Sequence, residues 1–180
     1  MARDLRVTNI GRFPTRYAVD RRLVAIAAVV VIAAGLSLYY YYQSHGYVDV
    51  YVEGDPQYAV YLTVSSVMLH QESGGWITVS NSSETVQLES TPQLLASSSV
   101  PAGNYTEVRL VVTSVEVTVG PVNVSASLPS GILKVPIIRG GLHVSGGSTS
   151  KLLLLVGPHI VSTGNGGLML SPVITAEQVQ

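Results

Sequence analysis

Residues 47–53 read YVDVYVE, and this short stretch decides the fold class. Its three valines alternate with aromatic or acidic side chains, a period of two that is typical of a half-buried β-strand. The alternation returns in residues 60–70 (VYLTVSSVMLH) and in residues 108–117 (VRLVVTSVEV). Beyond residue 43 we find no convincing helical periodicity. The sequence therefore predicts an all-β domain.

The two longer β segments carry the same irregularity, 48 positions apart. In each, the apolar positions change phase at a pair of hydroxyl residues, Ser65-Ser66 in the first and Thr113-Ser114 in the second. A phase change turns the inward face outward unless a bulge or a sharp bend corrects it. The repeated slip predicts a built-in bend, at a point where a strand passes from one sheet to another. Chance similarity between two β-rich segments is the alternative.

The remaining sequence consists of short strands separated by turns, the pattern of a β-sandwich. The predicted features are a Gly74-Gly75 turn with a strand at Trp76–Val79, an edge strand at 132–138 because it contains Pro136, a strand buried on both faces at Leu152–Val156, and a hairpin over 159–170.

A membrane anchor precedes the β domain. Residues 23–42 (LVAIAAVVVIAAGLSLYYYY) carry no charge, and about 20 apolar residues in a helix span the hydrocarbon layer. We place a transmembrane helix at 23–43, with the lipid bilayer as its partner. The predicted membrane-interface residues are the basic Arg21 and Arg22 at one end and the aromatic Tyr39, Tyr40, Tyr41 and Tyr42 at the other.

The charge distribution orients the anchor. The tail, residues 1–22, holds six arginines against two aspartates, a net charge of +4. By the positive-inside rule this tail is cytoplasmic, and the domain at 47–176 is extracytoplasmic on a single-pass cell-membrane protein. The alternative is a signal peptide cleaved near residues 33–35, but its basic region would be unusually long. Twin-arginine and pilin-type signals fit less well, because the residues around Arg21-Arg22 do not otherwise match them.

Composition excludes several function classes. Residues 23–180 hold four basic and nine acidic side chains, a net charge of −5, which argues against nucleic acid as the partner. Cysteine is absent, so disulfides, thiolate metal sites, cysteine nucleophiles and lipobox acylation are excluded. The domain must be stabilised by its apolar core.

Three N-x-S/T sequons lie beyond the anchor and fit an outside location. Asn81, Asn104 and Asn123 are therefore possible N-glycosylation sites. We predict on this basis that the protein is a glycoprotein.

Four segments in a fixed order carry a family resemblance: VYLTVSSVMLH (60–70), GGW (74–76), PAGNYTEVRL (101–110) and TGNGGLMLSPV (163–173). Over residues 47–176 the chain resembles a prokaryotic family of extracytoplasmic β domains of unknown function, many of them surface lipoproteins. The resemblance implies an Ig-like or transthyretin-like β-sandwich at the cell surface, and no activity. Here a membrane helix replaces the lipobox. The chain is also short between Val119 and Gly131, which leaves the strand count open.

Candidate metal and catalytic residues do not form a recognisable constellation. No metal-ligand spacing links His45, His70, His143 and His159, and exposed strand ends are the better interpretation. A calcium cluster of Asp49, Glu53 and Asp55 competes with a solvated acidic face, which we favour. No GxSxG motif exposes a serine. We therefore predict no enzyme, no metal and no cofactor.

Arg109 is the charged residue of most interest, because it lies inside a predicted strand. Its ordinary role is an ion pair with Glu107 or Glu116, and a ligand-binding role is the alternative.

The leading functional hypothesis is a non-enzymatic surface or envelope protein that acts by protein or glycan contacts through sheet edges and loops. One alternative is an accessory subunit of a larger membrane complex, packed through small helix residues such as Ala27-Ala28. Another is self-association into a surface filament by strand donation. In that version Tyr47–Glu53 is the donated strand, and its deletion leaves a folded domain.

Overall fold

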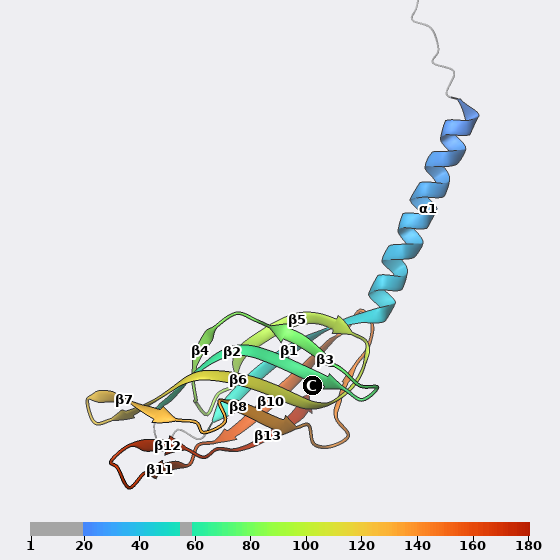
Figure 1. Ribbon diagram of the computed structural model, residues 1–180. Coiled ribbons are helices and arrows are strands. Elements are labelled where there is room, and N and C mark those ends of the chain that lie inside the picture. The colour runs from blue at the N-terminus through green and yellow to red at the C-terminus, as the bar shows by residue number, and fades with distance from the viewer. Residues whose placement is uncertain (1–19, 55–58) are drawn as a thin grey trace, which may run out of the picture. The chain divides into compact units, whose positions relative to one another are not determined.

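The computed structural model describes residues 20–54 and 59–180. Within these ranges the chain is mostly β, with one N-terminal helix, α1 (Arg21–Ser44), and thirteen strands (Figure 1). The chain divides into two compact units, residues 1–38 and 39–180. The end of α1 therefore belongs to the β unit. The strands are β1 (His45–Gly54), β2 (Val60–Gln71), β3 (Trp76–Ser80), β4 (Glu84–Gln87), β5 (Gln93–Pro101), β6 (Gly103–Val119), β7 (Val122–Ser127), β8 (Ile132–Pro136), β9 (Leu142–Val144), β10 (Thr149–Gly157), β11 (Ile160–Ser162), β12 (Leu168–Leu170) and β13 (Val173–Val179).

Helix α1 begins with a side-chain cap. The Asp20 Oδ1 atom accepts a hydrogen bond from the Arg22 backbone N–H at 2.9 Å, which satisfies one of the free amides of the first turn. The helix contains the predicted span 23–43, and it is long and apolar enough to cross a membrane. The membrane crossing itself stays a prediction. Of the basic tail, residues 1–19 lie outside the described residues.

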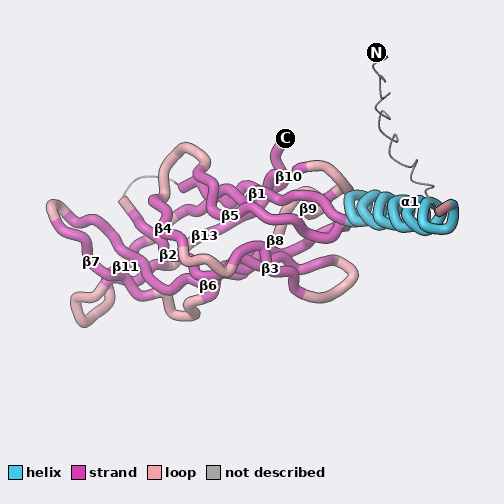
Figure 2. Tube along the Cα trace, turned by 90° about the horizontal axis from the view of Figure 1, so that it is seen from above, coloured by secondary structure: helices cyan, strands magenta, loops and turns pink. Residues whose placement is uncertain are grey.

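The strands form two sheets. The first has four strands in the order β13-β10-β1-β5, in which β1 runs parallel to β10 and antiparallel to β5. The second has nine strands along the path β11-β12-β7-β6-β2-β3, with β4 on β2 and with β8 and β9 on β6. Figure 2 shows the two layers, with β1, β5 and β10 on one side and β3, β6 and β8 on the other.

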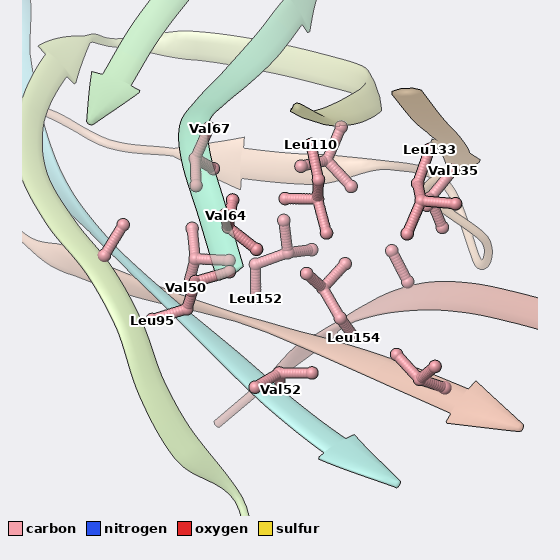
Figure 3. Close-up of a cluster of buried hydrophobic side chains, with 14 of the residues drawn as sticks. Val50, Val52, Val64, Val67, Leu95, Leu110, Leu133, Val135, Leu152 and Leu154 are labelled. Carbon is pink, nitrogen blue, oxygen red and sulfur yellow. The ribbon is translucent and has the colours of Figure 1, made fainter. Parts of the chain in front are cut away.

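One hydrophobic core lies between the sheets. Val50 and Leu152 from the four-stranded sheet point toward Val64 and Leu110 from the nine-stranded sheet (Figure 3). All four are at most 2% exposed. Each buried side chain of this size contributes about 1.5–3 kcal/mol, so alternate positions on the two inner faces supply the main stabilisation.

The two phase slips face each other in the structure. Strands β2 and β6 pair along most of their length. The pairing skips Ser65 on β2 and Thr113 on β6, and these two skipped residues lie close to each other along the ladder. Both strands stay in the same sheet, so the predicted passage between sheets is wrong. The phase change is instead corrected by irregularities in the register, and the apolar residues on both sides of each slip remain buried. The skipped side chains bond locally: Ser65 Oγ donates to Val111 O, and Thr113 Oγ1 donates to Thr63 O.

Strand β1 lies in the middle of its sheet. It pairs with β10 along one side and with β5 along the other, and Val48 and Val50 are fully buried. A strand in this position is part of the core. Deletion of Tyr47–Glu53 is therefore expected to unfold the domain and not to leave it folded. Donation of this strand to a neighbour stays a prediction.

The open sides of the two sheets approach each other. Strand β3, an end strand of the larger sheet, lies beside β5, an end strand of the smaller one. On the other side Ile137 forms a bridge to Ala176 of β13, and the Ile138 N–H donates to Ala176 O at 2.8 Å. The two sheets are therefore close to each other along both sides, with one bridge between them at Ile137 and Ala176.

Other local predictions compare as follows. Strand β3 follows the Gly74-Gly75 turn, β11 and β12 form the predicted hairpin, and β8 pairs with β6 alone among the described strands, as an edge strand does. Strand β10 was expected to be buried on both faces, but only one face is fully buried. Leu152 and Leu154 lie on that face, and the opposite face is partly exposed. The short stretch after Val119 holds a strand of its own, β7.

Candidate functional site

The outer face of the nine-stranded sheet brings together charged and aromatic side chains from four strands. In the register, Met68 stands opposite Thr78 on β3 and Arg109 on β6, and Arg109 stands opposite Lys134 on β8. The adjacent row joins Trp76, His70 and Glu107. Side chains directly opposite on neighbouring strands share a face, and the alternating Leu69 and Val108 point into the core. We call this surface the Trp76 face; it consists of Met68, His70, Trp76, Thr78, Glu107, Arg109 and Lys134.

A glycine turn fixes the position of Trp76. Gly74 and Gly75 have φ angles of 101° and 96°, which side chains other than glycine rarely adopt. The Gln71 N–H donates to Gly75 O at 3.0 Å, which closes the turn. Trp76 is therefore the first residue of β3, paired with His70, and the two rings lie 4.8 Å apart between centroids.

The Arg109 guanidinium lies over the Trp76 ring. Its Cζ atom is 3.8 Å from the ring centroid, within the range of a cation–π interaction of about 0.5–2 kcal/mol. Its Nη2 atom is 3.6 Å from Glu107 Oε1, and the two side chains are 25% and 34% exposed. The predicted ion pair with Glu107 is confirmed. The contact is an ion pair without a hydrogen bond, because 3.6 Å is too long for one.

Two polar atoms of this pair are left without partners. Arg109 Nε and Glu107 Oε1 are buried and make no hydrogen bond to any residue that the structure describes. Most buried polar groups in proteins are hydrogen-bonded, so an exception calls for an explanation. The guanidinium is therefore held in place by packing against Trp76 and not by a complete set of hydrogen bonds.

The Trp76 face also carries a pair of like charges. Arg109 and Lys134 stand directly opposite each other on β6 and β8, an arrangement that is destabilising in sheets. The other two cations beyond the anchor each have an acid nearby: Arg139 Nη1 is 3.1 Å from Glu177 Oε2, and Lys151 is in register with Asp49. Among the described residues, Glu107 pairs with Arg109, and Lys134 makes no ion pair. Two of the domain's four basic side chains therefore stand opposite each other on the sheet face that carries its tryptophan.

A charge reversal on β8 is expected to stabilise the protein. Lys134→Glu converts the like-charge pair into an opposite-charge pair, which is expected to raise the free energy of unfolding by about 0.5–1 kcal/mol. Urea unfolding of the full chain, followed by Trp76 fluorescence, measures this. The matched control is Lys151→Glu, which places a like charge opposite Asp49 and is expected to lower the free energy of unfolding. Equal destabilisation by both variants would contradict the repulsion at Arg109–Lys134.

The predicted glycan acceptors are all exposed. Asn81 Oδ1 accepts from Ser66 Oγ at 3.2 Å, and Asn123 Oδ1 accepts from Thr118 Oγ1 at 2.8 Å. Asn104 differs, because its Nδ2 donates to Glu72 Oε2 at 3.1 Å and its Oδ1 is 2.7 Å from His143 Nδ1. Glycosylation at these positions stays a prediction.

The histidines are dispersed over the domain. His70 belongs to the Trp76 face, His143 contacts Asn104, and His159 lines a surface groove with Glu53 and Thr175. His45 is stacked on Tyr41, with a centroid distance of 4.4 Å. Among the described residues no group of three or more histidine or acidic side chains is placed to hold a metal ion. Of the acidic cluster, Asp55 lies outside the described residues; Asp49 accepts from Ser97 Oγ.

The membrane-interface candidates lie at the two ends of α1. Arg21 and Arg22 are its first residues, and Tyr39 to Tyr42 occupy its last turns with more than half of each side chain exposed. The helix runs into β1 without a linker: the Ala102 N–H donates to Ser44 O at 2.8 Å, and the Gly147 N–H donates to His45 O at 2.8 Å. A side chain at Gly146 would collide with the carbonyl of Gln43.

Comparison with known families accounts for most of the β domain. Residues 45–172 match the family described as Domain of unknown function (DUF4382). The chain belongs to this family. The DUF4382 match begins at the first residue of β1 and ends just before β13, whose Ala176 completes the core. No curated protein and no solved structure matches the chain. The expected membership of a family of unknown function is confirmed, whereas its prokaryotic range and lipoprotein context stay predictions.

Sequence reasoning paired two members of the Trp76 face of this DUF4382 domain, Arg109 and Glu107, and did not connect them with the others. The pairing of Arg109 with Glu107 could be predicted from the sequence, because the two residues lie two positions apart on one predicted strand. Trp76 and His70 had a usable signal, since they border residues 71–75, which contain the Gly74-Gly75 turn, and a hairpin pairs such positions. Lys134 had none, because only the β6–β8 register brings it opposite Arg109.

Proposed function

We propose that this DUF4382 protein is a membrane-anchored, extracytoplasmic binding protein that acts by protein or glycan contacts, without catalysis. The observation that carries the proposal is the Trp76 face: a tryptophan packed against the Arg109 guanidinium, with a second cation, Lys134, directly opposite Arg109 in the register, an arrangement that is destabilising in sheets. Retaining a destabilising arrangement on an exposed surface is typical of binding sites. Tryptophan, methionine and arginine are also the side chains enriched at recognition surfaces.

Helix α1 is proposed to be a retained anchor with the basic tail in the cytoplasm. The +4 charge of residues 1–22 and the tyrosines at the other end support this orientation. The direct passage of α1 into β1, held by the Ser44 and His45 backbone hydrogen bonds, supports retention of the helix in the mature protein. The domain is then outside the membrane, at the cell surface or in the envelope, where sequon glycosylation is possible.

The finer fold assignment that we propose is an Ig-like sandwich. Tyr105 lies at the corner where the chain passes from β5 in one sheet to β6 in the other, and it is fully buried. Its hydroxyl donates to Pro101 O, four residues upstream, at 2.7 Å. A buried tyrosine that bonds back to the chain at such a corner is a feature of Ig-like sandwiches.

Site-specific photo-crosslinking in native membranes tests the binding function. A photoreactive residue in place of the exposed Thr78, on the Trp76 face, is expected to give a covalent adduct of defined size. The same residue in place of Lys151, exposed on the outside of the other sheet, serves as the control. Arg109→Met, combined with the Thr78 probe, is expected to reduce the adduct by about tenfold or more, as for the loss of a binding hot spot.

Adducts that are equal at the two probe positions, or that are insensitive to Arg109→Met, would contradict the use of this face. An adduct with a protein of defined size supports protein contact, and one that glycosidase treatment removes supports glycan contact.

A further inference from the structure

We propose that the Trp76 face binds a carboxylate-bearing glycan, a chain of uronic-acid type, in which a sugar carboxylate bridges Arg109 and Lys134. This inference rests on the proposed binding function and names the ligand class for the same face. It follows from three features of the described residues: the like-charge pair in register, the guanidinium held against Trp76 and the nearby carboxylate of Glu107.

The charges of this face select an anion. Arg109 and Lys134 stand opposite each other, and Lys134 is exposed and makes no ion pair with a described residue. A carboxylate held between them replaces their repulsion with two attractive contacts. Residues 23–180 carry a net charge of −5, so this patch is a local exception. Charges separated by more than about 8 Å are largely screened at physiological ionic strength, so the local pair governs the contact.

The guanidinium is already oriented for a planar acid. Its contact with Trp76, with Cζ 3.8 Å from the ring centroid, restricts the position of the guanidinium before any ligand arrives. An arginine in a fixed plane can donate two parallel hydrogen bonds to one carboxylate. Little side-chain entropy is then lost on binding, which favours affinity.

Glu107 favours a sugar over an acidic peptide. Its side chain is 34% exposed and lies beside Arg109, so a ligand that reaches Arg109 also meets a carboxylate, which accepts hydrogen bonds and donates none. One uronate ring carries both kinds of group. Its carboxylate accepts hydrogen bonds from the cations, and its hydroxyl groups donate hydrogen bonds to Glu107. A run of aspartate or glutamate side chains offers acceptors only and repels Glu107. The apolar face of a sugar ring can also lie against Met68 and Trp76.

Fluorescence of Trp76, the only tryptophan of the chain, reports binding at this face directly. The full chain in a neutral detergent is titrated with polygalacturonate near physiological ionic strength, with excitation at wavelengths that the tyrosines do not absorb. We expect a saturable change in emission. Lys134→Gln is expected to weaken the apparent affinity by about tenfold, as for loss of one charge-assisted contact. Lys151→Gln removes the same charge from the other sheet and is expected to leave the affinity unchanged within about twofold.

Dextran, a neutral glucan, and poly-L-glutamate, an acidic peptide, are the comparison ligands. Stronger binding of polygalacturonate than of either supports the proposal. No change in emission with polygalacturonate, equal binding of dextran, or preference for poly-L-glutamate would overturn it. The crosslinks at Thr78 separate this failure from that of the proposed function. If they persist, the face binds another class of partner; if they are also absent, the binding function fails as well.

Discussion

Replacement of Val50 by aspartate is expected to unfold the β domain. Val50 is fully buried at the centre of β1, between β5 and β10, and faces the apolar side chains of the opposite sheet. An unpaired charge at such a site lowers stability by about 3–5 kcal/mol, on a scale where whole domains are stable by about 5–15 kcal/mol. A large fall in the urea midpoint, or loss of the β circular-dichroism signal without urea, is the expected result.

The matched control lies on the same strand. Tyr47 is 51% exposed, three positions before Val50, and Tyr47→Asp is expected to change the free energy of unfolding by less than about 1 kcal/mol. The contrast also tests the position of β1. If Val50→Asp were as mild as Tyr47→Asp, β1 would not be a core strand, and its deletion would be expected to leave a folded domain.

Truncation of Tyr105 is expected to have the second large effect. Tyr105→Ala removes the largest of the fully buried side chains and leaves a cavity, which is expected to lower the free energy of unfolding by about 3–5 kcal/mol. Tyr105→Phe keeps the ring and removes only the hydrogen bond to Pro101 O, at an expected loss of about 1 kcal/mol. Urea unfolding of the three proteins separates ring packing from the hydrogen bond.

The control for the hydroxyl is Tyr61→Phe. Tyr61 is half-buried on β2, and its hydroxyl makes no hydrogen bond to a described residue, so this variant is expected to be nearly neutral. Equal losses from Tyr105→Phe and Tyr61→Phe would show that the corner hydrogen bond contributes nothing.

The difference between wild type and Tyr105→Phe is also expected to depend on pH. Burial raises the pKa of the Tyr105 phenol above its ordinary value of 10.0. At a pH above that value the unfolded chain releases a proton that the folded chain retains, so the free energy of unfolding falls as pH rises. The advantage of wild type is therefore fully present below pH 10.0 and shrinks above it, whereas Tyr105→Phe lacks this contribution.

Local features of the fold could be predicted from the sequence, and long-range ones could not. The alternation in residues 47–53 identified β1, and Pro136 marked an edge strand, because both signals reside in neighbouring residues. The parallel pairing of β1 with β10, in which Tyr47 stands opposite Thr149, left no trace in either pattern. Strand β5 (Gln93–Pro101) was missed because three consecutive serines, Ser97 to Ser99, hide its alternation.

The same limit explains the error over the phase slips. Each slip was visible in its own strand, at Ser65 and at Thr113, but a bulge and a passage between sheets give the same one-strand pattern. Only the pairing of β2 with β6 distinguishes them, since two skipped residues on opposite strands restore a common register. The composition of the Trp76 face could not be predicted for the same reason, because only the strand register places Lys134 opposite Arg109.

The two sheets approach each other along their open sides, where β3 lies beside β5 and Ile137 joins β13. This arrangement has a consequence for a protein with the proposed membrane anchor. Proteins anchored in a bilayer diffuse in two dimensions and meet their own copies at high local concentration. Unpaired strand edges are templates for aggregation under such crowding. A domain whose open sides lie close to another part of its own chain gives a neighbouring copy less access for strand pairing. Under the proposed function, recognition then falls to side chains on a sheet face.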